Sequence, residues 1–397
     1  MTSHAMTICL SWLLVGMALV GHGGLHVALY NRLNATGLSR RMIKRTEWLL
    51  LISCCTIPVL LLFFYFRPVV EVLSRRTDWS SLPWGLRLYA MVCWGTWLYP
   101  GLPWLVTRPI LGFRQAPCQF QRRRLSVDQQ LPQSPALSRK CRILSRVPCN
   151  QIFELEIVEK DLLVPGLPSQ FDGLRIAHLS DIHLTGHISP DFFSYAVQQA
   201  NHWHPDFMVI TGDIVDDDLC IEWLPRCFAE ATARLGKYFI LGNHDKRVRC
   251  PQDIRQTMQQ IGWQDVGGRW VSYSAADGVI DWVGNESPWF AAPSDHNPRS
   301  TSVLDIALCH SPDCIDWARR QSIPLLLAGH THGGQGRLPL AGPILSPSRH
   351  GSRFASGEFF LAPTTMHVSR GLSGLHLLRL NCPPELPLLT LRSAPLR

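Results

Sequence analysis

The chain has 397 residues, a length that suits two or three domains. Hydrophobic residues make up 46% and charged residues 17%, and the formal net charge is +8. Thirteen cysteines without a C-x-x-C pair favour unpaired thiols in a reducing compartment over a disulfide scaffold. No aromatic side chains alternate with the basic ones, so nucleic acid is not an expected partner.

Three uncharged apolar stretches open the chain, at residues 6–30, 48–66 and 88–107. About 20 apolar residues cross the core of a bilayer, so residues 1–110 are predicted to form a transmembrane region of about three spans. The third stretch contains prolines and glycines near its end, which favour a short, kinked or re-entrant segment. For each stretch the alternative is a buried helix of a soluble protein.

Basic residues follow the first and the third stretch, including Arg40, Arg41 and Lys44 in the first loop. Short loops rich in Lys and Arg stay in the cytoplasm. With three spans, the basic loop after the first stretch and the basic segment after the third stretch lie on the same side of the membrane. We therefore expect a multi-pass protein of the cell (inner) membrane with its C-terminal part in the cytoplasm. If the third stretch does not cross, that part lies outside.

Residues 111–150 are rich in Arg, Gln, Ser and Pro and show no sustained periodicity, so they are predicted to be a basic linker at the membrane surface. Such a segment is attracted to anionic lipid headgroups, and the lipid bilayer is thus an expected partner.

From residue 151 onward, apolar strands alternate with amphipathic helices. This alternation predicts an α/β fold, layered as a sandwich, for one domain over residues 151–397. A hairpin is expected at 270–283, with its turn at 276–278. The expected strands are 153–158, 174–179, 207–210, 238–241, 305–308 and 325–328, and the expected helices are 191–202, 221–234, 253–261 and 313–320.

Five polar clusters each come directly after a predicted strand, where α/β folds gather their ligands. Carboxylate and imidazole ligands suit Mn, Fe or Zn, and two adjacent ions stabilise both oxygens of a phosphoester displacement. A single cluster of this kind is commonly a turn or a surface loop, whereas five in series predict a site for two metal ions. The clusters are Asp181-Ile182-His183, Gly212-Asp213-Ile214-Val215-Asp216, Gly242-Asn243-His244-Asp245, Cys309-His310 and Gly329-His330-Thr331-His332.

These clusters resemble the pattern of the calcineurin-like metallophosphoesterase superfamily: D-x-H, G-D-x-x-D, G-N-H-[DE], a later His and G-H-x-H. The resemblance extends over about residues 150–397. Other stretches resemble its membrane-associated bacterial branch, which includes phosphodiesterases and UDP-2,3-diacylglucosamine pyrophosphatases. They are Gly166-Leu167-Pro168, Phe171 to Arg175, Gly333-Gly334-Gln335, Val368-Ser369-Arg370-Gly371 and Cys382-Pro383-Pro384-Glu385.

The resemblance implies a role for each residue. One divalent ion would be bound by Asp181, His183 and His332. The other would be bound by Asn243, His310 and His330, with Asp213 bridging the two. A hydroxide shared by the ions would attack phosphorus.

The remaining polar residues of the clusters are implied to act beside the ions. His244 would lie against the phosphate, held and kept protonated by Asp216, and Asp245 would support the ligands from behind. Arg247 and Arg249 either bind a second phosphate or belong to a solvated loop.

Other polar residues are expected to have structural roles, or their roles stay open. His178 lies inside a predicted strand and is expected to be a core residue with satisfied hydrogen bonds. His22 and His26 are four residues apart and are expected to share a helix face that packs within the bundle. Asn285 and Ser287 stand where the bacterial branch would have acidic residues, which leaves the substrate contacts there open.

The sequence thus predicts a membrane-anchored hydrolase with a dinuclear metal site. The substrate would carry a phosphodiester or pyrophosphate bond and could be lipid-linked or a nucleotide sugar. One alternative is a general phosphodiesterase or phosphatase that is merely tethered to the membrane. Others are a catalytically silent membrane scaffold, and a sensor or transporter whose membrane region carries the function.

Overall fold

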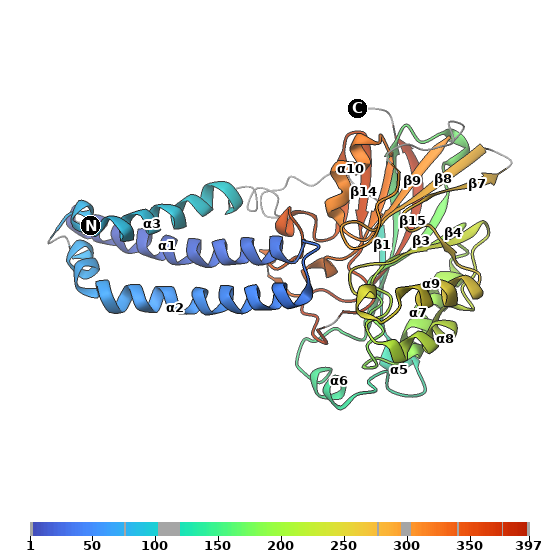
Figure 1. Cartoon of the computed structure of the whole chain (residues 1–397), viewed down its shortest axis with the longest axis horizontal. Coiled ribbons are helices and arrows are strands. Elements are labelled where there is room, and N and C mark those ends of the chain that lie inside the picture. Colours follow the sequence, from blue (N-terminus) through green and yellow to red (C-terminus); the bar gives the residue numbers. More distant parts are fainter. Residues whose placement is uncertain are drawn as a thin grey trace. The chain divides into compact units, whose positions relative to one another are not determined.

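The computed structural model describes residues 3–74, 77–101, 120–275, 278–294, 303–339, 341–374 and 376–394. The chain divides into two compact units, Met1–Phe113 and Arg114–Arg397. The first unit is helical and the second contains both helices and β-sheets (Figure 1).

Two long helices dominate the first unit: α1 (Ser3–Leu33) and α2 (Arg40–Leu73). Ser39 caps α2 by accepting a hydrogen bond from the Met42 amide, and α2 bends at Tyr65 between two prolines. Ile8–Leu33 and Arg40–Leu73 are long and apolar enough to cross a membrane. These two segments are therefore candidate transmembrane helices.

The third predicted span begins inside α3 (Trp84–Thr96), which continues as a short π-helix, η2 (Trp97–Gly101). At 1.5 Å per residue, α3 is about 20 Å long, which is less than the roughly 30 Å of a bilayer core. Residues 102–107 of the predicted span lie outside the described residues. Among the described helices, α3 is thus not a candidate for crossing the membrane. The total number of membrane crossings stays a prediction.

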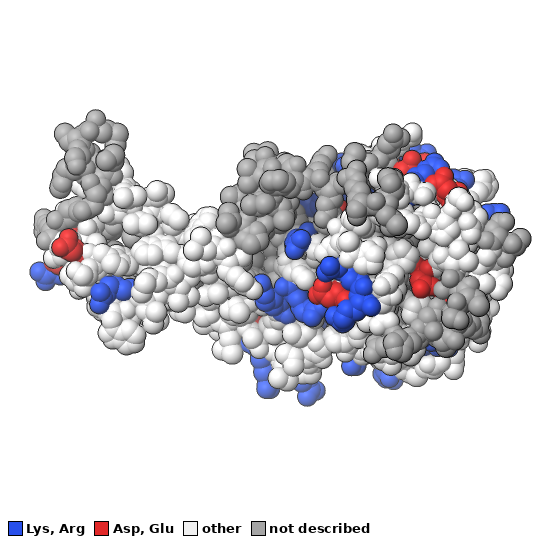
Figure 2. All heavy atoms as spheres, turned by 90° about the horizontal axis from the view of Figure 1, so that it is seen from above, with Lys and Arg blue, Asp and Glu red and all other residues white. Residues whose placement is uncertain are grey.

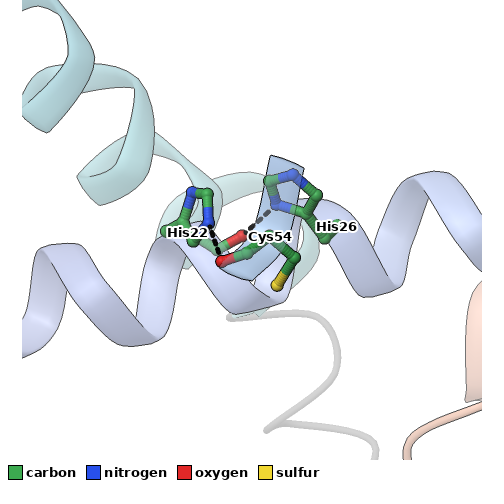
Figure 3. A group of neighbouring side chains, drawn as sticks. All are labelled: His22, His26 and Cys54. Atoms are coloured by element: carbon green, nitrogen blue, oxygen red, sulfur yellow. Dashed lines mark hydrogen bonds between the residues drawn. The ribbon is translucent and has the colours of Figure 1, made fainter. Parts of the chain in front are cut away.

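Two histidines of α1 join it to the neighbouring helices (Figure 3). The His22 ring contacts the Cys54 carbonyl oxygen through Nε2 at 3.0 Å. The Tyr89 hydroxyl contacts Nδ1 of the same ring. His26 contacts the His22 carbonyl oxygen and the Ser53 hydroxyl, both at 2.9 Å. Because all four ring nitrogens have partners, the group of His22, His26 and Cys54 is explained by helix packing, as expected from the spacing of the two histidines.

The first unit also contains a cavity of about 780 Å³. Its walls are mostly aliphatic and come from all three helices, for example Leu14 of α1, Leu61 of α2 and Leu86 of α3. His22 and Tyr89 supply polar groups to the same cavity. A volume of this size is in the range of cavities that bind small molecules.

The second unit is built on two main β-sheets. The seven-stranded sheet has the order β1-β2-β15-β3-β4-β5-β6, and the six-stranded sheet has the order β13-β14-β10-β9-β8-β7. Strands β11 (Arg337–Leu338) and β12 (Gly342–Pro343) form a separate pair. The other strands are β1 (Phe120–Ser126), β2 (Glu154–Pro165), β3 (Arg175–Leu179), β4 (Phe207–Thr211), β5 (Gly236–Ile240), β6 (Gln264–Asp265), β7 (Trp270–Ala275), β8 (Gly278–Asn285), β9 (Leu304–Cys309), β10 (Leu325–Ala328), β13 (Gly357–Leu361), β14 (Thr364–Val368) and β15 (Glu385–Ala394).

The helices of the second unit cover the outer faces of the sheets (Figure 1). Helices α7 (Pro190–His202), α8 (Leu224–Phe228) and α9 (Pro251–Gln260) pack on the seven-stranded sheet, and α10 (Ile315–Arg320) packs on the other. The short helices are α5 (Val127–Gln130), α6 (Arg139–Leu144), η1 (Trp79–Ser81), η4 (Ser169–Phe171), η5 (Asp218–Trp223), η6 (Asp245–Arg247), η7 (Pro312–Cys314), η8 (His332–Gly334) and η9 (Gly351–Phe354).

Three apolar clusters separate these layers. The middle one lies between the sheets, where Ile176 and Val209 of one sheet meet Ile306 of the other. Because side chains alternate along a strand, the neighbouring Ala177 and Met208 face the helices instead. The layers are therefore helix, sheet, sheet and helix, which confirms the predicted α/β sandwich.

Most predicted elements are present, with two differences. The expected helix at 221–234 is replaced by η5 and the shorter α8, because Pro225 has no amide hydrogen and is best placed in a first helical turn. Within the expected linker at 111–150, β1 pairs with β2 as an edge strand. Its arginines hide the strand pattern, and charged residues are common on such edges. Residues 276 and 277 of the expected turn lie outside the described residues.

Exposed arginines gather on the second unit. Arg319 and Arg320 of α10 and Arg349 and Arg353 after it are all exposed. Figure 2 shows basic side chains grouped around acidic ones on one face. Two ion pairs contribute here, Arg319 with Asp316 and Arg349 with Asp313, each at 3.9 Å. Arg349 Nη2 also donates to the Asp313 carbonyl oxygen at 2.7 Å, and Arg319 Nε donates to the Ala362 carbonyl oxygen at 3.1 Å, so both guanidinium groups are held at an exposed surface.

Candidate metal centre

All five predicted clusters lie at one edge of the two sheets. Strands β3, β4 and β5 run parallel to one another, and so do β8, β9 and β10. The clusters follow β3, β4, β5, β9 and β10 directly, so the loops at the carboxyl ends bring their side chains together.

The backbone of these loops is unusual. Positive φ angles between 49° and 72° occur at five of the expected ligands, Asp181, His183, Asp213, His330 and His332. Non-glycine residues rarely adopt this conformation, and it is concentrated at functional sites, where the surrounding structure holds it in place.

Two glycines allow the loops to approach closely. A Cβ atom on Gly242 would lie 2.3 Å from Asp213 Oδ1, and one on Gly329 would lie 1.8 Å from Ser180 Oγ. The Gly-Asn and Gly-His pairs of the motifs are thus required by the packing of the site as well as by its chemistry.

The expected ligands form two groups that share Asp213. Asp181, His183 and His332 surround it on one side, and His310 and His330 on the other, with all donor atoms of each group within 4.8 Å of one another. Asn243 joins the second group, since its Oδ1 lies 3.0 Å from His310 Nε2. The structure therefore brings all seven side chains together.

The donor atoms are arranged as ligands of metal ions would be. His183 Nε2 and His332 Nε2 face each other at 3.2 Å, and two ligands about 2 Å from one ion are separated by roughly this distance. Among the described residues, Asp213 Oδ2 and His330 Nε2 are buried without a hydrogen-bond partner. A buried polar atom without a partner is unfavourable, so these residues fit divalent cations well.

Asp216 holds two histidines at once. It accepts hydrogen bonds from His183 Nδ1 at 2.6 Å and from His244 Nδ1 at 2.5 Å. Burial alone would raise the pKa of Asp216, but the two imidazoles hold it well below its usual range. Asp216 was expected to orient His244 only. Its contact with His183 adds the support that a metal-binding imidazole commonly receives.

His244 lies between Asp216 and a guanidinium group. Arg247 donates from Nη2 to His244 Nε2 at 2.7 Å and from Nη1 to Asp216 Oδ1 at 2.7 Å. Burial lowers the pKa of His244. In this arrangement Nδ1 donates to Asp216 and Nε2 accepts from Arg247, and the protonated ring implied by the family resemblance stays a prediction. The permanent positive charge beside the site belongs to Arg247.

The two arginines suggested for substrate binding are placed differently. Arg247 contacts the cluster as described, but Arg249 keeps 90% of its side chain exposed and pairs with Asp218 at 3.4 Å. The structure thus brings Arg247 to the site and places Arg249 on the surface.

Asp245 connects the loops from behind. Its carboxylate accepts hydrogen bonds from the amides of Ile214, Val215 and Gly242 at 2.7–2.8 Å. Burial, followed by the charge of Asp213, raises the pKa of Asp245 to about 7. Because these contacts tie the loop after β4 to the loop after β5, Asp245 is a positioning residue.

Trp289 was not expected to contribute to the site. Its ring packs against His310 and His330, with centroid distances of 5.4 and 4.9 Å. The sequence feature that could have indicated this role is the pair Pro288-Trp289, which directly follows Ser287. The neighbouring Asn285 and Glu286 are structural, because they accept hydrogen bonds from the amides of Ser287 and Leu241.

Comparison with known proteins agrees with this geometry. The profile of the family described as "Calcineurin-like phosphoesterase" matches residues 174–334. The uncharacterized metallophosphoesterase YkuE of Bacillus subtilis is 29% identical over 247 residues, which are 60% of this chain and 86% of that protein.

Two further relatives have more specific names. The phosphodiesterase YaeI of Escherichia coli is 26% identical over 223 residues, covering 55% of this chain and 82% of that protein. The UDP-2,3-diacylglucosamine pyrophosphatase LpxG of Chlamydia muridarum is 23% identical over 290 residues, covering 58% and 88%. The chain therefore contains a calcineurin-like phosphoesterase domain and is a metal-dependent phosphoric ester hydrolase.

Proposed function

We propose that the chain is a membrane-anchored phosphoesterase that uses two divalent ions to hydrolyse a phosphodiester or pyrophosphate bond. The observation that carries this proposal is the pair of ligand groups that share Asp213. Asp181, His183 and His332 would hold one ion, and Asn243, His310 and His330 the other. Mn, Fe and Zn all suit these ligands.

Bound ions would supply an activated water and would stabilise the charge that develops on the phosphoryl oxygens. The side chains around them would orient the reaction. Asp216 fixes the rings of His183 and His244, and Arg247 lies where it can donate to a phosphate oxygen. Once Arg247 turns toward the phosphate, His244 Nε2 would be free to take up a proton from solvent, and the protonated ring would give that proton to the leaving oxygen while Nδ1 stays bonded to Asp216.

We propose an amphiphilic, lipid-linked substrate. The candidate transmembrane helices would keep the enzyme at the bilayer, where such substrates are concentrated. The exposed arginines of the second unit would attract anionic headgroups. The name of the Chlamydia relative, a pyrophosphatase for a diacylated nucleotide sugar, supports the same substrate class. The second candidate is a general phosphodiesterase that is only tethered, which the name of the E. coli relative favours.

Acylation of the substrate should decide between these two. We expect kcat/KM of the full chain in detergent to be at least about 10-fold higher for a diacylated nucleotide sugar than for its deacylated analogue. Burial of two methylene groups, at about 0.8 kcal/mol each, already corresponds to this factor. The Asp213→Ala variant serves as the control for contaminating hydrolases. Equal kcat/KM for both compounds would leave only the general phosphodiesterase.

We further propose that the catalytic unit lies in the cytoplasm, since basic segments flank the first and third apolar stretches. Green fluorescent protein and alkaline phosphatase are fused in parallel after Arg397. We expect fluorescence and no alkaline phosphatase activity. The opposite pattern would place the catalytic unit outside and would mean that the third stretch does not cross.

A further inference from the structure

A continuous row of hydrogen bonds leads from a buried lysine to one of the expected metal ligands. Alternation along the strands places its members in the layer between the two sheets. The contacts, in order, are Lys160 Nζ to His367 Nε2 at 3.4 Å, His367 Nδ1 to His178 Nδ1 at 3.1 Å, His178 Nε2 to Thr211 Oγ1 at 2.9 Å, Thr211 Oγ1 to Ser180 Oγ at 2.8 Å, and Ser180 Oγ to Asp181 Oδ2 at 2.7 Å.

The two ends of this row determine its direction. An ammonium group can only donate and a carboxylate can only accept. Lys160 therefore donates to His367, whose other nitrogen must carry the proton and donate to His178. His178 in turn accepts on Nδ1 and donates from Nε2. The hydroxyls of Thr211 and Ser180 pass the same polarity on to Asp181.

The surroundings support two neutral imidazoles in this row. Both histidines are fully buried, and burial lowers the pKa of His178 well below its usual value and that of His367 to about 3. Lys160 remains charged because it also pairs with Glu358 at 2.8 Å and Glu385 at 3.1 Å. In a buried layer, hydrogen bonds of one polarity reinforce one another.

We infer that the row from Lys160 to Ser180 positions Asp181 for its metal ion. Ser180 donates to Oδ2, and the His330 amide lies 3.0 Å from both carboxylate oxygens. Oδ1 is the oxygen on the side of His332 Nε2, which lies 3.6 Å away. The polarised row holds this orientation and carries part of the lysine's positive potential to the carboxylate. His178, His367 and Thr211 are thus positioning residues, and their role rests on the proposed metal site.

Thr211 offers a nearly isosteric test. Thr211→Val removes the hydroxyl from the middle of the row, and Thr211→Ser restores it. Thr364→Val is the matched control, because Thr364 is equally buried but donates to the Ile323 carbonyl outside the row. The full chain is stripped with a chelator in detergent and titrated with Mn²⁺, and free Mn²⁺ is followed by electron paramagnetic resonance.

Loss of a residue that supports a metal ligand typically weakens metal binding by about 10- to 100-fold. We expect this loss at one ion site in Thr211→Val, together with near wild-type binding in Thr211→Ser and Thr364→Val. Unchanged affinity in Thr211→Val, or equal loss in Thr364→Val, would overturn the inference. Failure of the wild-type chain to bind any of Mn²⁺, Fe²⁺ and Zn²⁺ would instead overturn the proposed function.

The remote end of the row gives an independent readout that does not depend on metal. Nitrogen NMR of the full chain labelled with ¹⁵N-histidine should show His178 protonated on Nε2 and His367 on Nδ1. Each signal is assigned from its loss in His178→Gln or His367→Gln. The reverse assignment of tautomers would contradict the direction of the row.

Discussion

Replacing Asp213 with Ala should leave the chain with almost no bound metal and should reduce hydrolysis by at least about 1,000-fold. Asp213 is shared by both ligand groups, so its loss removes a ligand and negative charge from each. Metal ions stabilise the transition state by several kcal/mol, and each 1.4 kcal/mol corresponds to tenfold in rate. Elemental analysis of the purified variant and its turnover of an aryl phosphodiester measure both effects.

The control for this variant is Asp316→Ala. Asp316 keeps 48% of its side chain exposed and forms a long ion pair with Arg319, at 3.9 Å. We expect wild-type metal content and activity from it. Full metal occupancy in Asp213→Ala would refute the assignment of a shared ligand.

Replacing His244 with Ala should separate turnover from metal binding. His244 contacts Asp216 and Arg247 through its ring and is not among the expected ligands. One positioned proton-transfer group contributes about 100- to 10,000-fold, so we expect a loss of kcat in this range with both ions retained. His202→Ala, at an exposed position at the end of α7, is the matched control. Activity that falls only in proportion to lost metal would show that the role of His244 is wrong.

Asp216→Asn tests a different consequence of the same geometry. Because Asp216 holds both His183 and His244, its amide variant should weaken metal binding and also slow turnover. Loss of a group that supports a metal ligand typically lowers metal affinity or activity by about 10- to 100-fold. A variant that keeps full metal affinity would show that the contact with His183 is unimportant.

The layered fold was accessible from the sequence because its buried strands are short, apolar and separated by amphipathic helices. Parallel strands place their carboxyl ends at one edge, so the order of the clusters also predicted which side chains would meet. The position of β15 between β2 and β3 was not accessible. No local pattern indicates that the last strand of a chain enters the middle of a sheet.

Long-range contacts account for most of what the sequence did not predict. His178 was expected to be a satisfied core residue, but its partner His367 is 189 positions away and belongs to the other sheet. The surroundings of His244 depend on Arg247, whose side chain could equally have pointed into solvent like that of Arg249. Such choices follow from packing and charge in the folded chain.

The most direct test of the account is the metal content of the wild-type chain. The full chain, purified in detergent and supplied with Mn²⁺, is analysed for bound metal and assayed before and after treatment with a chelator. We expect about two ions per chain, loss of hydrolysis on chelation and recovery when Mn²⁺ is returned. A chain that hydrolyses phosphodiesters equally well after all metal has been removed would contradict the central claim.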